Sequence, residues 1–122
     1  MDNSSVKEHA FANAFAKAQV AAQLANLTEP RAVSAYYDHT KHLISIQLLS
    51  GASFTFPPDI AQGLAGAKPE ELEQVEVTPM GDGLHWEILD ADLSVPHLLQ
   101  GIFGSPQWMT NLRHQWRAQM SQ

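Results

Sequence analysis

The sequence predicts an α+β fold, in which a small antiparallel β-meander sheet is packed by helices. Short stretches of alternating apolar and polar residues, separated by turn residues, fill the middle of the chain, whereas helical periodicity occupies both ends. The length of 122 residues fits one domain with its own core. We therefore expect a single domain with an N-terminal helical extension (1–28), a core α+β domain (30–104) and a C-terminal amphipathic helix (105–122).

The N-terminal extension is predicted to form one long helix that begins after Ser5, which with Glu8 fits a capping box. Its apolar residues make two stripes: Phe11 and Phe15 lie on one face, and a valine and two leucines lie nearly opposite. A helix that packs only on its own domain needs one apolar face, so the second face favours contact with a partner, often a second copy of the chain. The alternative is that flanking segments of the same chain cover both sides.

The core domain is predicted to begin with a meander after Pro30. Ile44 and Ile46 alternate with polar residues and are expected to point inward, as is Phe56. Pro57-Pro58 stops strand pairing and is expected to start a helix over 59–65. The predicted strands are 32–37, 43–49, 53–56, 72–78 and 84–88.

The segment from Gly83 to Gly104 is predicted to turn a strand into a helix. Trp86 is expected to pack in the core, and Asp90 and Asp92 to hold the turn that follows it. Ser94 fits the N-cap of a short helix that Gly101 ends. Ser105-Pro106 then signals the start of a last helix, which is expected to run to about residue 119.

Composition narrows the function classes. The formal net charge is -6, and residues 59–92 hold nine acids against one lysine, whereas no acid follows residue 92. An acidic surface repels nucleic acid, which argues against such a partner, while the basic tail suits the acidic segment of the same or another subunit. The chain has no cysteine, no secretory signal and no run of 18 apolar residues. We therefore expect a cytoplasmic protein that does not enter a membrane.

One group of residues has the chemistry of a metal or catalytic site. His85, Asp90 and Asp92 are ligand-type residues close together in the sequence, but their spacing matches no shared helical face. A structural role in the turn is the favoured interpretation. There is no nucleophile motif and no glycine-rich phosphate loop, so we predict no catalytic residue and no cofactor.

The last helix carries the clearest single pattern. Its apolar residues fall within an arc of roughly 120° at about 100° per residue. Trp, Met and Arg are enriched where proteins bind one another, so we predict a partner-binding surface here. The alternative is that the stripe covers the domain's own sheet. The predicted partner-binding residues are Trp108, Met109, Leu112, Arg113 and Trp116, together with Phe11 and Phe15 of the first helix.

Residues 30–104 resemble the bacterial family known as domain of unknown function 2442. The resemblance rests on the meander followed by Phe56-Pro57, and on Gly83, His85, Trp86, Leu89, Asp90, Asp92, Leu98, Leu99 and Gly101 in that order. It implies a compact α+β domain and no established reaction. Family members often have Pro after the Trp, where this chain has Glu87. Some relatives carry a helix-turn-helix and others look like half of a two-protein module.

The favoured hypothesis is a non-catalytic protein-binding or regulatory module, a homo-oligomer that self-associates through its terminal helices. One alternative is a small metal-binding protein or enzyme centred on His85, Asp90 and Asp92. The other is a nucleic-acid-associated regulator, which the single basic helix with few Lys or Arg supports poorly.

Overall fold

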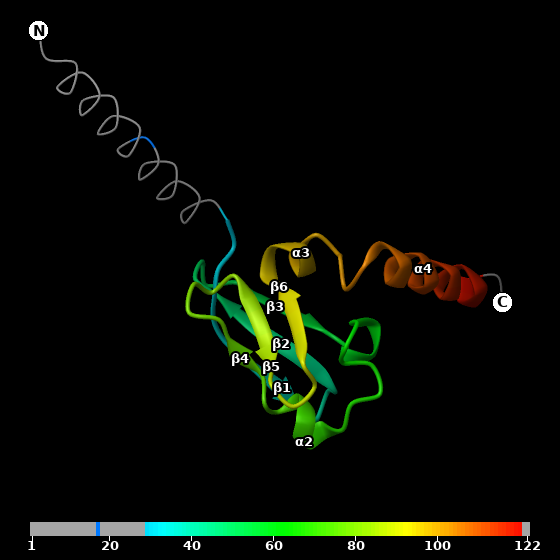
Figure 1. The fold of residues 1–122 in the computed structure, drawn as a ribbon, viewed down its shortest axis with the longest axis horizontal. Coiled ribbons are helices and arrows are strands. Elements are labelled where there is room, and N and C mark those ends of the chain that lie inside the picture. The colour runs from blue at the N-terminus through cyan, green and yellow to red at the C-terminus, as the bar shows by residue number, and fades with distance from the viewer. Residues whose placement is uncertain (1–16, 18–28, 121–122) are drawn as a thin grey trace, which may run out of the picture.

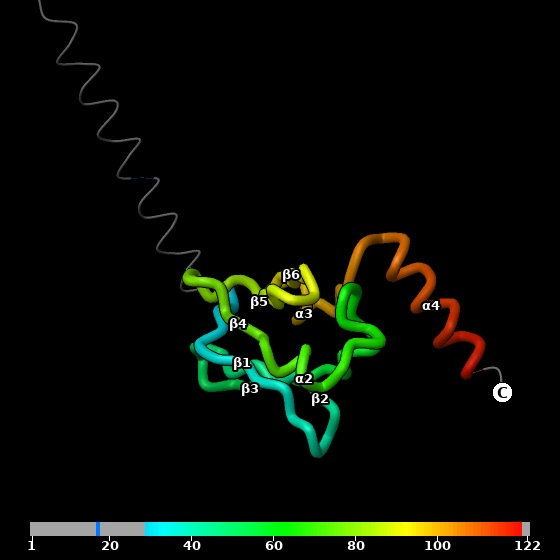
Figure 2. Tube along the Cα trace, turned by 60° about the horizontal axis from the view of Figure 1, so that its bottom comes forward, coloured from blue at the N-terminus to red at the C-terminus, as the bar shows by residue number. Residues whose placement is uncertain are grey.

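The fold is α+β, as the sequence predicts, and is built on two antiparallel three-stranded sheets. The computed structural model describes residue 17 and residues 29–120, so the predicted N-terminal helix with Phe11 and Phe15 lies outside the described residues. The first sheet has the order β1-β2-β3 and the second the order β4-β5-β6. The two sheets lie in separate layers, one above the other in the turned view of Figure 2.

The first sheet is the predicted meander. Its strands are β1 (Ala32–Asp38), β2 (Leu43–Leu48) and β3 (Ser53–Phe56). Ile44 and Ile46 on β2 and Phe56 on β3 are fully buried, which confirms the predicted inward face. Alternation along β2 and β3 therefore sets the register, in which Ile46 lies opposite Phe54 and Ile44 opposite Phe56.

The second sheet is assembled from shorter strands. They are β4 (Glu76–Val77), β5 (Gly83–Trp86) and β6 (Ala91–Ser94). The sheets meet where Ala32 of β1 donates its N–H to the C=O of Gly81 at 2.7 Å. A Cβ atom on Gly81, which has φ +73°, would lie 2.6 Å from the C=O oxygen of Ala32, so only glycine permits this close contact.

Two predicted elements are wrong. The helix expected over 59–65 is only a 3₁₀ turn, η1 (Pro58–Ile60), because Ala61 returns to extended geometry with φ -104° and ψ 130°. The left-handed φ of 89° at Gly63 keeps the following residues from resuming a helix. The strand expected over 72–78 is reduced to the two residues of β4, and its first residue instead ends a helix, α2 (Pro69–Leu72). Pro69 at the helix start and the Glu71 carboxylate, which accepts the Lys68 N–H, favour this helical turn.

The two C-terminal helices confirm the predicted start signals. Helix α3 (Val95–Leu99) begins after Ser94, whose hydroxyl oxygen accepts the His97 N–H at 3.3 Å, and Gly101 follows it with φ +82°. Helix α4 (Pro106–Met120) starts at the predicted Pro and extends past the body of the domain (Figure 1). No helix among the described residues is long and apolar enough to cross a membrane.

The core lies between the two sheets and is closed by α2, α3 and the first turns of α4. Trp86 is its largest fully buried side chain, and the indole N–H donates to the Leu72 C=O at 3.1 Å. The other fully buried large side chains are Ile44, Ile46, Phe56, Leu64, Leu84, Val95 and Leu98. Because one side chain contacts the interior of the second sheet and the end of α2, Trp86 links elements that the chain joins only through loops.

Replacing Trp86 by Phe is expected to lower the free energy of unfolding by about 1–3 kcal/mol, because the Leu72 C=O then has no donor in a buried site. Trp86→Ala should cost about 3–5 kcal/mol, since it also leaves a cavity. Urea denaturation followed by circular dichroism measures both changes. Trp116→Phe on the exposed part of α4 is the control and should stay within about 0.5 kcal/mol. A Trp86→Phe protein as stable as wild type would show that the indole hydrogen bond contributes nothing.

Candidate functional site

The His85 side chain lies on the outer face of the second sheet. Alternation along β5 buries Leu84 and Trp86 completely and turns His85 outward, where 28 % of its side chain is exposed. The pairing of β5 with β6 sets Asp92 directly opposite His85. The strand register therefore determines the position of this histidine.

Two carboxylates hold the imidazole ring. Its Nδ1 lies 2.7 Å from Oδ1 of Asp92 and its Nε2 lies 2.6 Å from Oε2 of Glu87. Because both partners are acceptors, the ring donates from both nitrogens only as the imidazolium. The hydrogen bonds to Glu87 and then to Asp92 raise the pKa of His85 from 6.5 to about 9, and partial desolvation opposes them.

This arrangement differs from the predicted group of three. His85 and Asp92 are brought together, but Asp90 occupies the turn between β5 and β6 with a left-handed φ of 49°, and its carboxylate has no part in the two contacts of His85. The sequence reasoning missed Glu87, which it treated only as a departure from the family's usual Pro. The position of Glu87, two residues after His85 at the end of a strand, was the available signal.

The expectation that Asp92 holds a strand-to-helix turn is also wrong. Residues 91–94 form β6, so the segment runs strand, turn, strand and then helix. A doubly hydrogen-bonded imidazolium has no lone pair for a metal ion or for a substrate proton. The described residues contain no group of three or more His, Cys, Asp or Glu side chains arranged for a metal ion. In this geometry the contacts of His85 join β5 to β6 and to the residue that follows β5.

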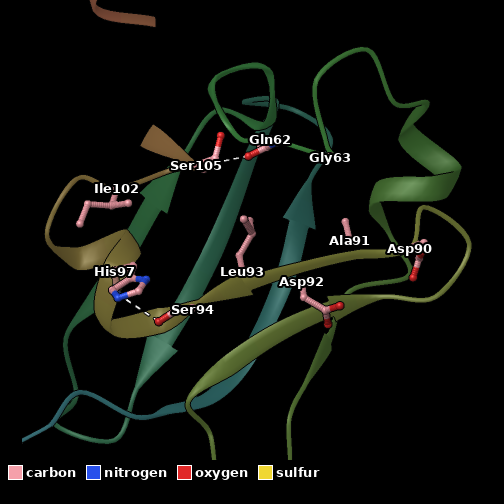
Figure 3. Close-up of a pocket in the computed structure, with 11 residues that line it drawn as sticks. Gln62, Gly63, Asp90, Ala91, Asp92, Leu93, Ser94, His97, Ile102 and Ser105 are labelled. Atoms are coloured by element: carbon pink, nitrogen blue, oxygen red, sulfur yellow. Dashed lines mark hydrogen bonds between the residues drawn. The ribbon is translucent and has the colours of Figure 1, made fainter. Parts of the chain in front are cut away.

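A groove of about 530 Å³ runs beside β6. Figure 3 shows Ala91–Ser94 along one side and Gln62 and Ser105 across from them. The opposite wall is held together by Gln62, whose N–H donates to the Phe103 C=O at 2.9 Å and whose side-chain oxygen accepts the Ser105 N–H at 2.8 Å. The lining residues are Gln62, Gly63, Asp90, Ala91, Asp92, Leu93, Ser94, His97, Ile102, Gly104 and Ser105.

The predicted partner-binding residues of α4 divide into two groups. Met109 and Leu112 are buried in the domain's own core, and the half-buried Trp108 donates its indole N–H to the Ile60 C=O at 2.9 Å. Arg113 is exposed, and Trp116 keeps 40 % of its surface exposed. The first half of the helix thus attaches it to the domain, and the second half presents side chains to solvent.

Comparison with known proteins places the fold in a family. Residues 32–104 match the family described as "Protein of unknown function (DUF2442)". The chain belongs to this family. The matched part of this DUF2442 protein contains both sheets, the His85 cluster and α3, and it ends before α4. A search of curated proteins gives no match.

Two solved bacterial structures are similar to this DUF2442 protein. One is a protein of unknown function from Rhodospirillum rubrum, with 50% identity and a TM-score of 0.65, covering 67% of this chain and 99% of its own. The other is an uncharacterized protein from Chromobacterium violaceum, with 31% identity and the same TM-score of 0.65, covering 79% of this chain and 87% of its own. Both support the fold and neither names an activity.

The His85 cluster should make stability depend on pH. The folded-state pKa of about 9 exceeds the unfolded value of 6.5, so the stabilisation is complete below about pH 6.5 and is lost as the pH rises through 9. We expect the melting temperature of the wild type, relative to that of His85→Gln, to fall between pH 6.5 and 9.5, the upper limit being roughly half a unit above the raised pKa. The ring-proton titration in NMR measures the same pKa directly. A ring that titrates near 6.5 would show that the two carboxylates do not hold it charged.

Proposed function

We propose that this protein is a non-catalytic protein-binding or regulatory module that self-associates through its terminal helices in the bacterial cytoplasm. The supporting observation is the apolar surface that α4 carries beyond the domain. Trp116 is 40 % exposed and Met120 is 86 % exposed, and both continue the stripe that Met109 and Leu112 begin in the core.

The shape of α4 suits a second copy of the chain. The helix extends away from the two sheets (Figure 1), so its outer turns are accessible from several sides. Trp and Met side chains beside arginines are the residues that anchor protein interfaces, and Arg113 and Arg117 flank Trp116. A second copy buries the two stripes against each other and supplies, from residues 59–92, the acids that the C-terminal segment lacks.

Converting the exposed stripe to acid should reduce self-association. The variant Trp116→Asp/Met120→Asp is expected to sediment as a smaller species than the wild type, because two charges cannot be buried in the interface. His114→Asp/Ala118→Asp adds the same two charges at exposed positions on the opposite face of α4 and is the matched control. Sedimentation velocity over a range of concentrations measures the effect. A wild type that stays monomeric at the highest concentration, or a control that dissociates equally, would contradict self-association through this stripe.

A further inference from the structure

Strand β6 is an edge of the second sheet. The Val95 N–H donates to the Asp82 C=O at 2.9 Å, which makes this a hydrogen-bonded pair of the β5–β6 ladder. Hydrogen-bonded pairs alternate along an antiparallel ladder, so the backbone groups of Ala91 and Leu93 point toward β5 and those of Asp92 point the other way. Within residues 29–120, no backbone hydrogen bond joins Asp92 to a segment beyond this sheet.

The groove lies along this free edge. Five consecutive residues, 90–94, line it, which is the pattern of a cavity that follows a backbone rather than one side-chain face. A Cβ atom on Gly63 would lie 3.0 Å from the Ala91 Cβ, so glycine keeps that end of the groove from being filled by a side chain. Its volume of about 530 Å³ is within the usual range of binding pockets.

One edge strand of the first sheet, β3, is different. Pro57 and Pro58 follow it directly, and proline has no N–H to donate to an added strand. The β3 residues line none of the described cavities. Strand β6, unlike β3, therefore has both an unpaired backbone edge and a groove beside it.

The acidic side chains beside the groove favour a basic strand as its ligand. Asp90 and Asp92 line the groove, which has no Lys or Arg among its lining residues, and Asp92 is 71 % exposed at its side chain. Pairing two copies of β6 would bring the two Asp92 side chains opposite or diagonal to each other, and like charges in those positions are destabilising. A strand with Lys or Arg on the same face has the opposite, favourable effect.

We propose that the β6 edge accepts an extended segment of a partner protein, bearing Lys or Arg at alternate positions, as a fourth strand of the β4–β5–β6 sheet. This mode of recognition draws affinity from main-chain hydrogen bonds and specificity from side chains on alternate positions. The inference rests on the protein-binding function proposed above, but it uses a surface other than α4.

The first test titrates the full chain with a six-residue peptide that alternates Lys and Val, followed by amide NMR. The expected result is saturable shifts at Asp92, Ser94, Gln62 and Ser105, and no binding of the matched Glu-Val peptide. Only one alternate set of peptide N–H groups faces β6, so N-methylation of that set should abolish binding and N-methylation of the other should not. Equal effects of the two methylations, shifts confined to α4, or no binding of the Lys-Val peptide would overturn the proposal.

The second test removes one backbone hydrogen-bond donor of the β6 edge by mutating the protein. Asp92→Pro deletes a backbone N–H that faces away from β5, so the β5–β6 pairing is kept and the variant should fold. The Asp92→Pro variant should bind the Lys-Val peptide about tenfold more weakly than Asp92→Ala, which keeps that N–H. Glu70→Lys, an exposed charge reversal on α2, should leave peptide binding unchanged. Equal affinities of the Pro and Ala variants would overturn the edge-strand geometry, and the methylated peptides test it independently if the Pro variant fails to fold.

Sedimentation separates this inference from the α4 proposal. Peptide binding that persists in Trp116→Asp/Met120→Asp supports the β6 edge whatever the oligomeric state. Self-association that Asp92→Pro abolishes would assign the edge to a second copy and overturn the basic-partner proposal.

Discussion

The packing of Trp86 between the two sheets is the constraint on which the rest of the structure depends. Its indole is fully buried on the inner face of the second sheet, and its N–H donates to the Leu72 C=O at the end of α2. A buried carbonyl without a donor is costly, so α2 and β5 are held in one relative position. Strands of two and four residues are too short to hold a sheet alone, and this packing compensates for them.

Strand β5 buries Trp86 and presents His85 to solvent, because successive side chains of a strand point to opposite faces of the sheet. The position of Trp86 in the core therefore fixes the position of His85 on the surface. Once Trp86 points inward, the register fixes His85 opposite Asp92 and close to Glu87. The imidazolium then joins β5 to β6 on the outside, as the Trp86 packing does on the inside. A slip of one residue would bury the charged ring and expose the indole, so the pattern protects the register.

The sequence predicted the fold class, the meander and both C-terminal helix starts, because alternation and N-cap chemistry are local signals. It failed where a distant contact overrides a local pattern. The helix expected over 59–65 gives way to a turn in which Gln62 bonds to Phe103, about 40 residues on. Strand β6 was missed because its preceding turn uses Asp90 at positive φ rather than Gly, and four residues carry too little periodicity to be recognised. Of the candidate site, His85 and Asp92 were foreseeable as a pair, whereas Glu87 and the groove depend on tertiary placement.

An exposed sheet edge is a hazard, and charged side chains are a common protection against edge-to-edge aggregation. Asp92 fits that role, yet its carboxylate is also held by His85, which orients one oxygen and leaves the side chain largely exposed. A charged residue that only prevents edge-to-edge pairing does not need its side chain held in one orientation, because a freely moving charge repels a second edge equally well. A fixed carboxylate beside an unpaired backbone and a groove discriminates by sign: it opposes a second β6, whose charge is the same, and favours a strand of opposite charge. In the two proposals, the acidic β6 edge and the acid-free helix α4 therefore bind through different residues and have opposite charge preferences.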